Sequence, residues 1–60
     1  MTGVEGKIAF ITGAGSGIGR ATARVLAKGG ADVALCDINL VAAEEVAQEV
    51  TNAGRRAVVL

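Results

Sequence analysis

The 60-residue chain predicts an α/β fold with a doubly wound parallel sheet, and three features of the sequence support this prediction. Short apolar segments alternate with longer amphipathic segments in the order β-α-β-α-β. The first short segment runs into a turn in which four of the nine glycines lie within residues 13–19. Each short segment is apolar at both alternating positions, which is typical of a parallel strand buried on two faces.

The first strand is expected at Lys7–Thr12, which is short, apolar and rich in β-branched residues. A helix is expected at Ile18–Lys28, because apolar residues recur there at helical spacing. Gly29 and Gly30 provide a left-handed stop after it. The apolar positions of this helix are Ile18, Ala21, Thr22, Val25 and Leu26. The basic residues at every fourth position, expected to form a solvated stripe, are Arg20, Arg24 and Lys28.

The second half of the chain follows the same alternation. A strand is expected at Ala31–Asp37, and Asn39 is expected to cap the helix that follows. Gly54 ends this helix, and a third strand is expected at Ala57–Leu60. The apolar positions of the second helix are Leu40, Ala43, Val46, Ala47 and Val50. The acidic residues expected to face water are Glu44, Glu45 and Glu49.

The expected topology leaves one face of the sheet uncovered. Crossovers between parallel strands are right-handed in nearly all proteins. Two successive crossovers in the same direction give the sheet order 3-2-1 and place both helices on one face. The other face would be bare, although the strands are apolar there too. We therefore expect residues 1–60 to be the amino-terminal part of a single doubly wound domain whose remainder is missing.

The composition excludes several classes of site. The chain has six basic and six acidic residues, no histidine, one cysteine and one aromatic residue. A neutral chain lacks the positive surface that binds DNA or an anionic membrane. One cysteine without histidine does not provide a zinc site, and a Ser/His/Asp or Cys/His nucleophilic centre is excluded. We therefore expect no metal, no nucleic acid and no membrane partner.

Targeting and membrane segments are not expected either. Residues 1–6 lack the apolar run of a signal peptide, and every uncharged apolar stretch is shorter than the roughly 18 residues of a membrane span. Cys36 alternates into a buried strand and is expected in the core. Arg55 and Arg56 flank the third strand, at the end opposite the glycine-rich turn, and are expected to be surface charges. The sequence thus favours a cytoplasmic protein.

The glycine-rich turn is typical of a phosphate-binding loop. Backbone N–H groups at a helix N-terminus attract anions, and glycine lets the backbone approach them closely. The P-loop of ATPases is excluded because the loop has no lysine, and the G-x-G-x-x-G pattern is out of register. Gly15 is extra to the pattern that fits and is expected to add flexibility only. That pattern is Thr-Gly-x-x-x-Gly-x-Gly, at Thr12, Gly13, Gly17 and Gly19.

The run from Ile11 to Ala21 resembles the classical short-chain dehydrogenase/reductase family, and the similarity extends over essentially all 60 residues. The resemblance implies a Rossmann-type fold and an NAD(P)-dependent oxidoreductase that moves a hydride between nicotinamide and an alcohol or carbonyl substrate. It also implies a homo-oligomer. The family's catalytic Ser, Tyr and Lys match nothing here, and the chain has no tyrosine. No catalytic residue is therefore assigned.

The resemblance and the chemistry of the loop give each loop residue an expected role in cofactor binding. Gly13 permits the sharp turn out of the strand, and Gly17 lets the pyrophosphate approach. Gly19 allows the helix to pack tightly on the sheet. The Ser16 hydroxyl is expected to donate toward the adenosine side, and the Ile18 amide is expected to face a phosphate oxygen.

Asp37 is the residue that discriminates between NAD and NADP in this interpretation. It ends the second strand 24 positions after Gly13, close to the offset of an acidic ribose ligand. Its carboxylate would accept from both ribose hydroxyls and repel a 2′-phosphate. NADP-preferring relatives usually carry a basic residue either beside Gly17 or just after the strand, and this chain has Ser16 and Ile38 at those two places. NAD is therefore expected rather than NADP, with Ile38 beside the adenine.

Two alternatives to the enzyme remain open from the residues alone. The chain would also suit a non-catalytic dinucleotide-binding module, such as a redox sensor or scaffold on the same fold. A different α/β nucleotide binder, such as a methyltransferase, shares the strand-loop-helix arrangement. A Tyr-x-x-x-Lys pattern beyond Leu60 would indicate the enzyme. The substrate itself is not specified by these residues, because functional sites vary on a shared fold.

Overall fold

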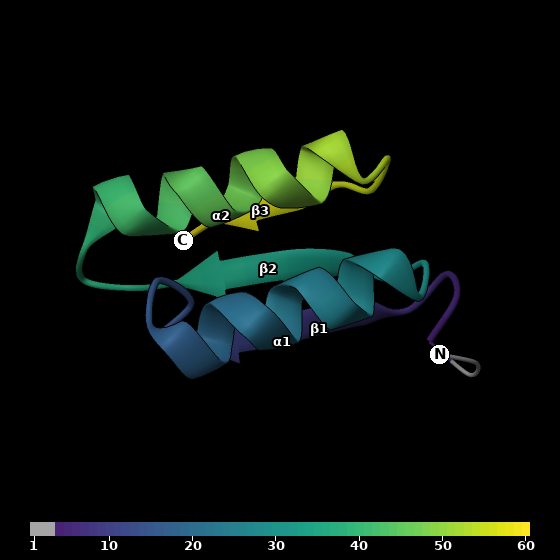
Figure 1. Cartoon of the computed structure of the whole chain (residues 1–60), viewed down its shortest axis with the longest axis horizontal. Coiled ribbons are helices and arrows are strands. Elements are labelled where there is room, and N and C mark those ends of the chain that lie inside the picture. The colour runs from purple at the N-terminus through teal and green to yellow at the C-terminus, as the bar shows by residue number, and fades with distance from the viewer. Residues whose placement is uncertain (1–3) are drawn as a thin grey trace.

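The computed structural model describes residues 4–60, and it contains three strands and two helices in the predicted order. Part of the segment interpreted above as free of a targeting signal, residues 1–3, lies outside the described residues. The elements are β1 (Ile8–Thr12), α1 (Gly17–Lys28), β2 (Asp32–Cys36), α2 (Leu40–Asn52) and β3 (Ala57–Val59) (Figure 1).

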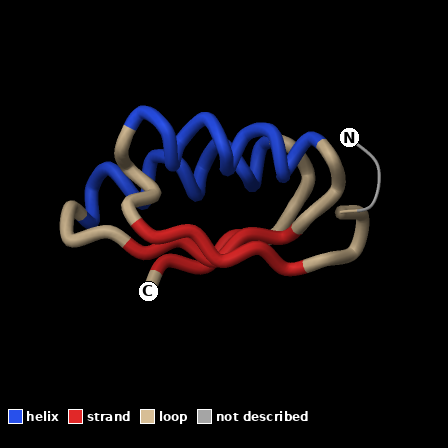
Figure 2. The backbone as a smooth tube through the Cα atoms, turned by 90° about the horizontal axis from the view of Figure 1, so that it is seen from below, coloured by secondary structure: helices blue, strands red, loops and turns tan. Residues whose placement is uncertain are grey.

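The three strands form one parallel sheet in the order β1-β2-β3, which confirms the predicted order 3-2-1. Ile8 pairs with Asp32 and Thr12 with Cys36, so β1 and β2 end at the same edge of the sheet. Both helices cover the same face, while the opposite face has no helix in the described part of the chain (Figure 2). Strands and helices thus alternate along the chain in a parallel α/β arrangement, as the sequence predicted.

Polar caps fix the start of each helix. Ser16 is the N-cap of α1, and its hydroxyl accepts a hydrogen bond from the Gly19 amide at 3.1 Å. Asn39 is the N-cap of α2, as predicted, and its side chain accepts from the Ala42 amide at 3.1 Å. Gly30 follows α1 with φ of +98°, the left-handed conformation that glycine adopts without strain. These caps set the two loops that precede α1 and α2.

The core lies between the sheet and the two helices. Val33 and Leu35 of β2 are its centre, and they contact buried residues of both helices. The buried side of α1 differs from the predicted one, because it consists of Gly19, Ala23 and Ala27, with Leu26 half-buried. Small side chains let α1 lie close to the sheet, so the larger apolar residues point outward. The exposed members of the predicted apolar stripe are Ile18, Ala21, Thr22 and Val25.

The uncovered face of the sheet is apolar. Ile8 and Phe10 of β1 are 79% and 62% exposed, and Val58 of β3 is 55% exposed. Cys36 points to this same face and is half-buried. The expectation that it lies in the core is therefore not met within residues 4–60. No helix among residues 4–60 is long and apolar enough to cross a membrane.

Candidate functional site

Two loops meet at the edge of the sheet where β1 and β2 end. Because Thr12 pairs with Cys36, the glycine loop after β1 and the turn after β2 leave the sheet side by side. The Ala14 amide donates to the Cys36 carbonyl at 3.2 Å and extends this pairing by one residue. Ala14 is fully buried, so the loop is anchored on the sheet.

The glycine loop turns sharply at Gly13. Its φ of +64° lies in the left-handed region, which disfavours any side chain. The Gly13 carbonyl accepts two hydrogen bonds from Ser16, from the amide at 3.0 Å and from the hydroxyl at 2.7 Å. A hydroxyl has a single proton to donate. The Ser16 proton, which we expected on the adenosine side of a ligand, is therefore committed to the loop in this structure.

The N-terminus of α1 projects from this turn. Within α1, the Arg20 amide is the first that donates to a backbone carbonyl, that of Ser16, at 2.8 Å. The amides of Gly17 and Ile18 come before it and have no acceptor within the helix, as at every helix start. Gly17 is exposed, and the Ile18 side chain is 85% exposed. Two N–H groups and the positive end of the helix dipole thus face an accessible surface.

Gly17 and Gly19 have different surroundings. A Cβ atom built on Gly17 would meet no atom within 4 Å, so the space beside it is open. A Cβ atom built on Gly19 would overlap the carbonyl oxygen of Gly13. Gly17 therefore leaves room for a ligand, whereas Gly19 leaves room for the backbone of the loop itself.

Asp37 joins the turn after β2 to the glycine loop. Its Oδ2 accepts from the Gly15 amide at 2.8 Å, and its Oδ1 accepts from the Asn39 amide at 2.9 Å. Hydrogen bonds from the Asn39 and Gly15 amides hold the pKa of the Asp37 carboxyl below its ordinary value. An ionised carboxylate has about four acceptor positions, so about two stay available for hydroxyl groups of a ligand.

All the predicted site residues lie in these two loops and the first turn of α1. Ile38 follows Asp37 and its side chain is fully exposed. The sequence interpretation missed the hydrogen bond from the Gly15 amide to Asp37, and it missed that Ala42 of α2 occupies the space that a side chain at position 15 would need. Gly15 is thus not merely flexible, and only the tertiary fold reveals this. The predicted residues placed at this edge are Gly13, Ser16, Gly17, Ile18, Gly19, Asp37 and Ile38.

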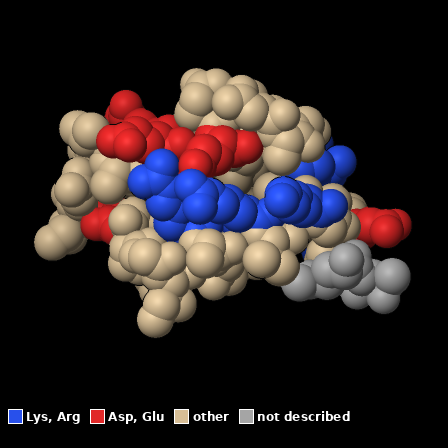
Figure 3. Space-filling model, in the orientation of Figure 1, with Lys and Arg blue, Asp and Glu red and all other residues tan. Residues whose placement is uncertain are grey.

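A cluster of ion pairs connects the two helices beside the site. Glu49 of α2 accepts from Arg20 Nε at 3.1 Å and also pairs with Arg24. These two guanidinium groups lower the pKa of Glu49 to about 2. The basic residues along α1 border the acidic residues of α2 over part of the band that they form (Figure 3). Two members of the expected solvated stripe are therefore paired, and Glu49 is half-buried rather than turned to water.

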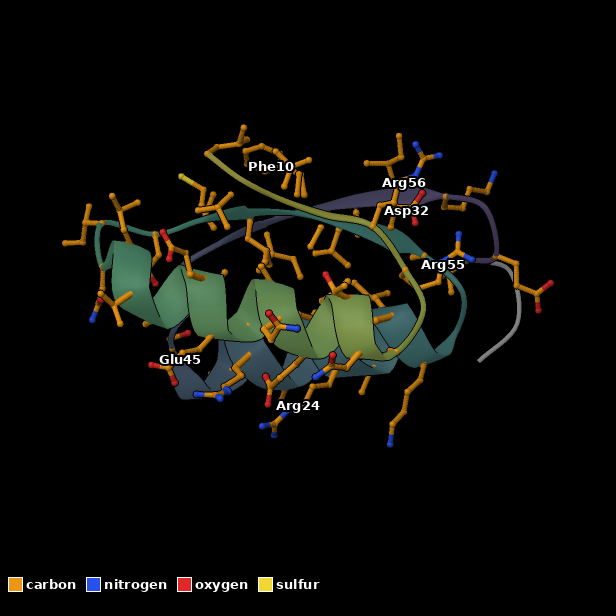
Figure 4. All side chains as sticks on the ribbon, turned by 90° about the horizontal axis from the view of Figure 1, so that it is seen from above. Phe10, Arg24, Asp32, Glu45, Arg55 and Arg56 are labelled. Carbon is orange, nitrogen blue, oxygen red and sulfur yellow. The ribbon has the colours of Figure 1, made fainter. Side chains whose placement is uncertain are left out.

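A second cluster lies at the other end of the sheet. Asp32 accepts from the Arg56 amide at 3.0 Å and pairs with Arg55 at 3.2 Å (Figure 4). The Arg56 amide, followed by the charges of Arg55 and Arg56, holds the pKa of Asp32 below its ordinary value. Arg56 is exposed, as expected, whereas Arg55 is half-buried. Because β2 separates Asp32 from Asp37, this cluster takes no part in the candidate site.

Comparisons with known proteins place this site in a family. The short chain dehydrogenase profile matches residues 7–60. Cyclohexanol dehydrogenase from Acinetobacter sp. (strain SE19) is 53% identical over 51 residues, which is 85% of this chain and 20% of the relative. The chain thus spans about a fifth of the length of this curated relative.

Two solved structures share the fold and carry a nucleotide. Carveol dehydrogenase from Mycobacterium avium, in complex with NAD, is 36% identical with a TM-score of 0.89, over 95% of this chain and 25% of that one. NAD⁺-bound xylitol dehydrogenase is 40% identical with a TM-score of 0.91, over 95% of this chain and 22% of that one. With the Thr-Gly-x-x-x-Gly-x-Gly loop at the end of β1, these matches show that the chain belongs to the short-chain dehydrogenase/reductase family.

Proposed function

We propose that this chain binds the adenosine diphosphate half of NAD in an NAD-dependent dehydrogenase. The observation that supports it most is the hydrogen bond of 2.8 Å between the Gly15 amide and the Asp37 carboxylate. It places an anionic acceptor of hydroxyl groups beside a helix N-terminus that attracts phosphate. The carveol and xylitol dehydrogenase structures, described as NAD complexes, have the same fold over this segment.

The residues present suit this half of the cofactor. The Gly17 and Ile18 amides would donate to the pyrophosphate, and the open space beside Gly17 would admit it. Asp37 would accept from the ribose hydroxyls with its remaining acceptor positions. The exposed Ile38 side chain offers an apolar surface for the adenine. Every one of these groups lies at one edge of the sheet.

Selectivity for NAD over NADP follows from the charge of Asp37. Its carboxyl is ionised at neutral pH, and the Asn39 and Gly15 amides, which lower its pKa further, stabilise that charged form. A 2′-phosphate beside it would bring like charges together. Ser16 and Ile38, the neighbours in the two loops, supply no positive charge to offset that repulsion. The site therefore favours a ribose with a free 2′-hydroxyl.

The dehydrogenase activity belongs to a longer polypeptide in this proposal. We call it the full-length protein, meaning a polypeptide of the relatives' length that contains residues 1–60 as the amino-terminal part of one Rossmann-type domain. A bound nicotinamide cofactor supplies hydride transfer to or from an alcohol or carbonyl carbon. The catalytic residues would lie outside these 60. The uncovered apolar face of the sheet supports this assignment, since doubly wound sheets carry helices on both faces.

The test of this function is turnover by the full-length protein. NADH oxidation with a panel of ketones, and NAD reduction with the matching secondary alcohols, should give activity with at least one pair. NADH binding without turnover on any substrate would support the sensor or scaffold instead, and absence of NADH binding would contradict the proposal. Cytoplasmic location and homo-oligomeric assembly, both part of the proposal, are tested by fractionation and by sedimentation velocity.

A further inference from the structure

The backbone conformation does not require glycine at position 15, but the neighbouring residues leave no space for a side chain there. Its φ is not positive, so an L-residue would fit the conformation. A Cβ atom built there, however, would lie 2.6 Å from the Ala42 Cβ and 3.1 Å from Asp37 Oδ2. Carbon atoms in contact normally stay about 3.5–4.0 Å apart. A side chain at this position would therefore have to move α2 or the Asp37 carboxylate.

Ala42 has little freedom to move on its own. Its amide donates to the Asn39 side chain at 3.1 Å, which is the cap that starts α2. The Asn39 amide in turn donates to Asp37 Oδ1 at 2.9 Å. Asp37 is thus held from two sides, by the Gly15 amide and by the turn that positions Ala42. A side chain at position 15 would therefore disturb both the hydrogen bond from the Gly15 amide and the turn that positions Ala42.

We propose that Gly15 and Ala42 are positioning residues that set cofactor selectivity by keeping the Asp37 carboxylate bound to the glycine loop. The inference rests on the proposed function, because it concerns how Asp37 discriminates between the two cofactors. A methyl group on residue 15 separates Asp37 Oδ2 from the Gly15 amide. The carboxylate then turns away from the ribose position, and selectivity falls although Asp37 itself is unchanged.

The test uses the full-length protein and a compensating pair of substitutions. Gly15→Ala should lower the ratio of the NADPH to the NADH dissociation constant by about tenfold. This is the effect expected when one hydrogen bond from a ribose hydroxyl of NADH to the charged Asp37 carboxylate is lost. Ala42→Gly removes the methyl group that the new side chain meets, so the double variant Gly15→Ala/Ala42→Gly should recover the wild-type ratio. Ala42→Val, which fills the same space from α2, should lower the ratio like Gly15→Ala.

A control separates this effect from loss of helix stability. Gln48→Gly places a glycine at an exposed position of α2, with a helix penalty of about 1 kcal/mol similar to that of Ala42→Gly. It lies away from Asp37 and should leave the ratio of dissociation constants unchanged. A double variant that does not recover the ratio when Gly15→Ala has lowered it would overturn the proposal.

A second measurement needs no cofactor. The Gly15 amide is one of the groups that lower the pKa of Asp37. Carboxyl ¹³C NMR titration should therefore find a higher Asp37 pKa in Gly15→Ala than in wild type, and a restored one in the double variant. An unchanged pKa together with an unchanged dissociation-constant ratio in Gly15→Ala would overturn the inference. Failure of the proposed function appears separately, as a wild-type protein that does not prefer NADH.

Discussion

At the level of a single residue, a substitution of Gly17 separates NADH binding from folding most clearly. Because the space beside it is open, Gly17→Val should leave the full-length protein folded. The same side chain would occupy the position where a pyrophosphate approaches the amides of α1. We expect NADH binding to be lost while the thermal melt by circular dichroism stays close to that of wild type. Normal NADH affinity in folded Gly17→Val would contradict the position assigned to the phosphates.

Gly19→Val is the matched comparison, two residues further on. Its side chain would overlap the Gly13 carbonyl oxygen, which is held by two hydrogen bonds from Ser16. We expect a loss of about 2 kcal/mol or more of stability, as for other overpacked sites. Urea denaturation of the two variants would measure it. Equal stability of Gly17→Val and Gly19→Val would contradict the distinction drawn between these glycines.

Asp37→Ala tests the discriminating carboxylate. The variant loses the acceptor for the ribose hydroxyls and the charge that repels a 2′-phosphate. NADH should bind about tenfold more weakly, since a hydrogen bond to a charged group is lost, while NADPH should bind no more weakly than before. Asp32→Ala, at the opposite end of β2, is the control and should keep the wild-type preference. A full preference for NADH in Asp37→Ala would place the discriminating group elsewhere.

At the level of the elements, the ion pairs between α1 and α2 make a pH-dependent contribution to the free energy of unfolding. Glu49 has its pKa lowered to about 2 by Arg24 and Arg20, from an ordinary value of 4.5. A carboxyl with a lowered pKa stabilises the fold above its ordinary pKa and loses that contribution as the pH falls through the folded-state value. Glu49→Gln should therefore destabilise the protein at pH 7, with the difference from wild type narrowing between pH 4.5 and about 2.

Urea midpoints of the full-length protein across that pH range measure the effect. Glu44→Gln is the control, because Glu44 is exposed on the same helix and joins none of the ion pairs found among residues 4–60. High salt should reduce the effect of Glu49→Gln, since Arg24 is exposed and dissolved ions screen its attraction to Glu49. A difference between Glu49→Gln and wild type that is constant down to the lowest pH would contradict the ion-pair account.

The sequence was sufficient to predict the elements and most of the buried side of α2, but not the buried side of α1. Caps such as Asn39 and the glycine-rich turn are local signals, so element order, strand direction and the loop were predictable. The buried side of α1 was predicted wrongly, because periodicity identifies an apolar stripe without saying how near the helix lies to the sheet. Its close approach selects the small residues Gly19, Ala23 and Ala27. The lack of space between Gly15 and Ala42 for a side chain depends on the same tertiary placement and has no signature in sequence spacing.

The uncovered face of the sheet determines how the whole molecule should behave alone. Phe10 (Figure 4) is more than half exposed on that face, and so is Val58. One cysteine provides no internal disulfide. Chains below about 70–80 residues rarely obtain enough stability from one core. Residues 1–60 expressed alone should therefore associate or stay unfolded, and should not oxidise NADH with ketones.

Sedimentation velocity and thermal melts by circular dichroism test this expectation. Phe10→Ser, which removes the aromatic ring from the open face, should reduce association without producing a stable monomer. A monomeric wild-type segment with a cooperative melt would show that the uncovered face needs no partner layer. Turnover by the segment would show that catalytic groups lie within these 60 residues.

The central claim is that the Asp37 carboxylate and the N-terminus of α1 form one site for the adenosine diphosphate half of NAD. Fluorescence titration of the wild-type full-length protein with NADH and with NADPH tests it most directly. The account predicts that NADH binds at least about tenfold more tightly than NADPH, because the 2′-phosphate meets an ionised carboxylate. Equal affinities, or tighter binding of NADPH, would contradict it.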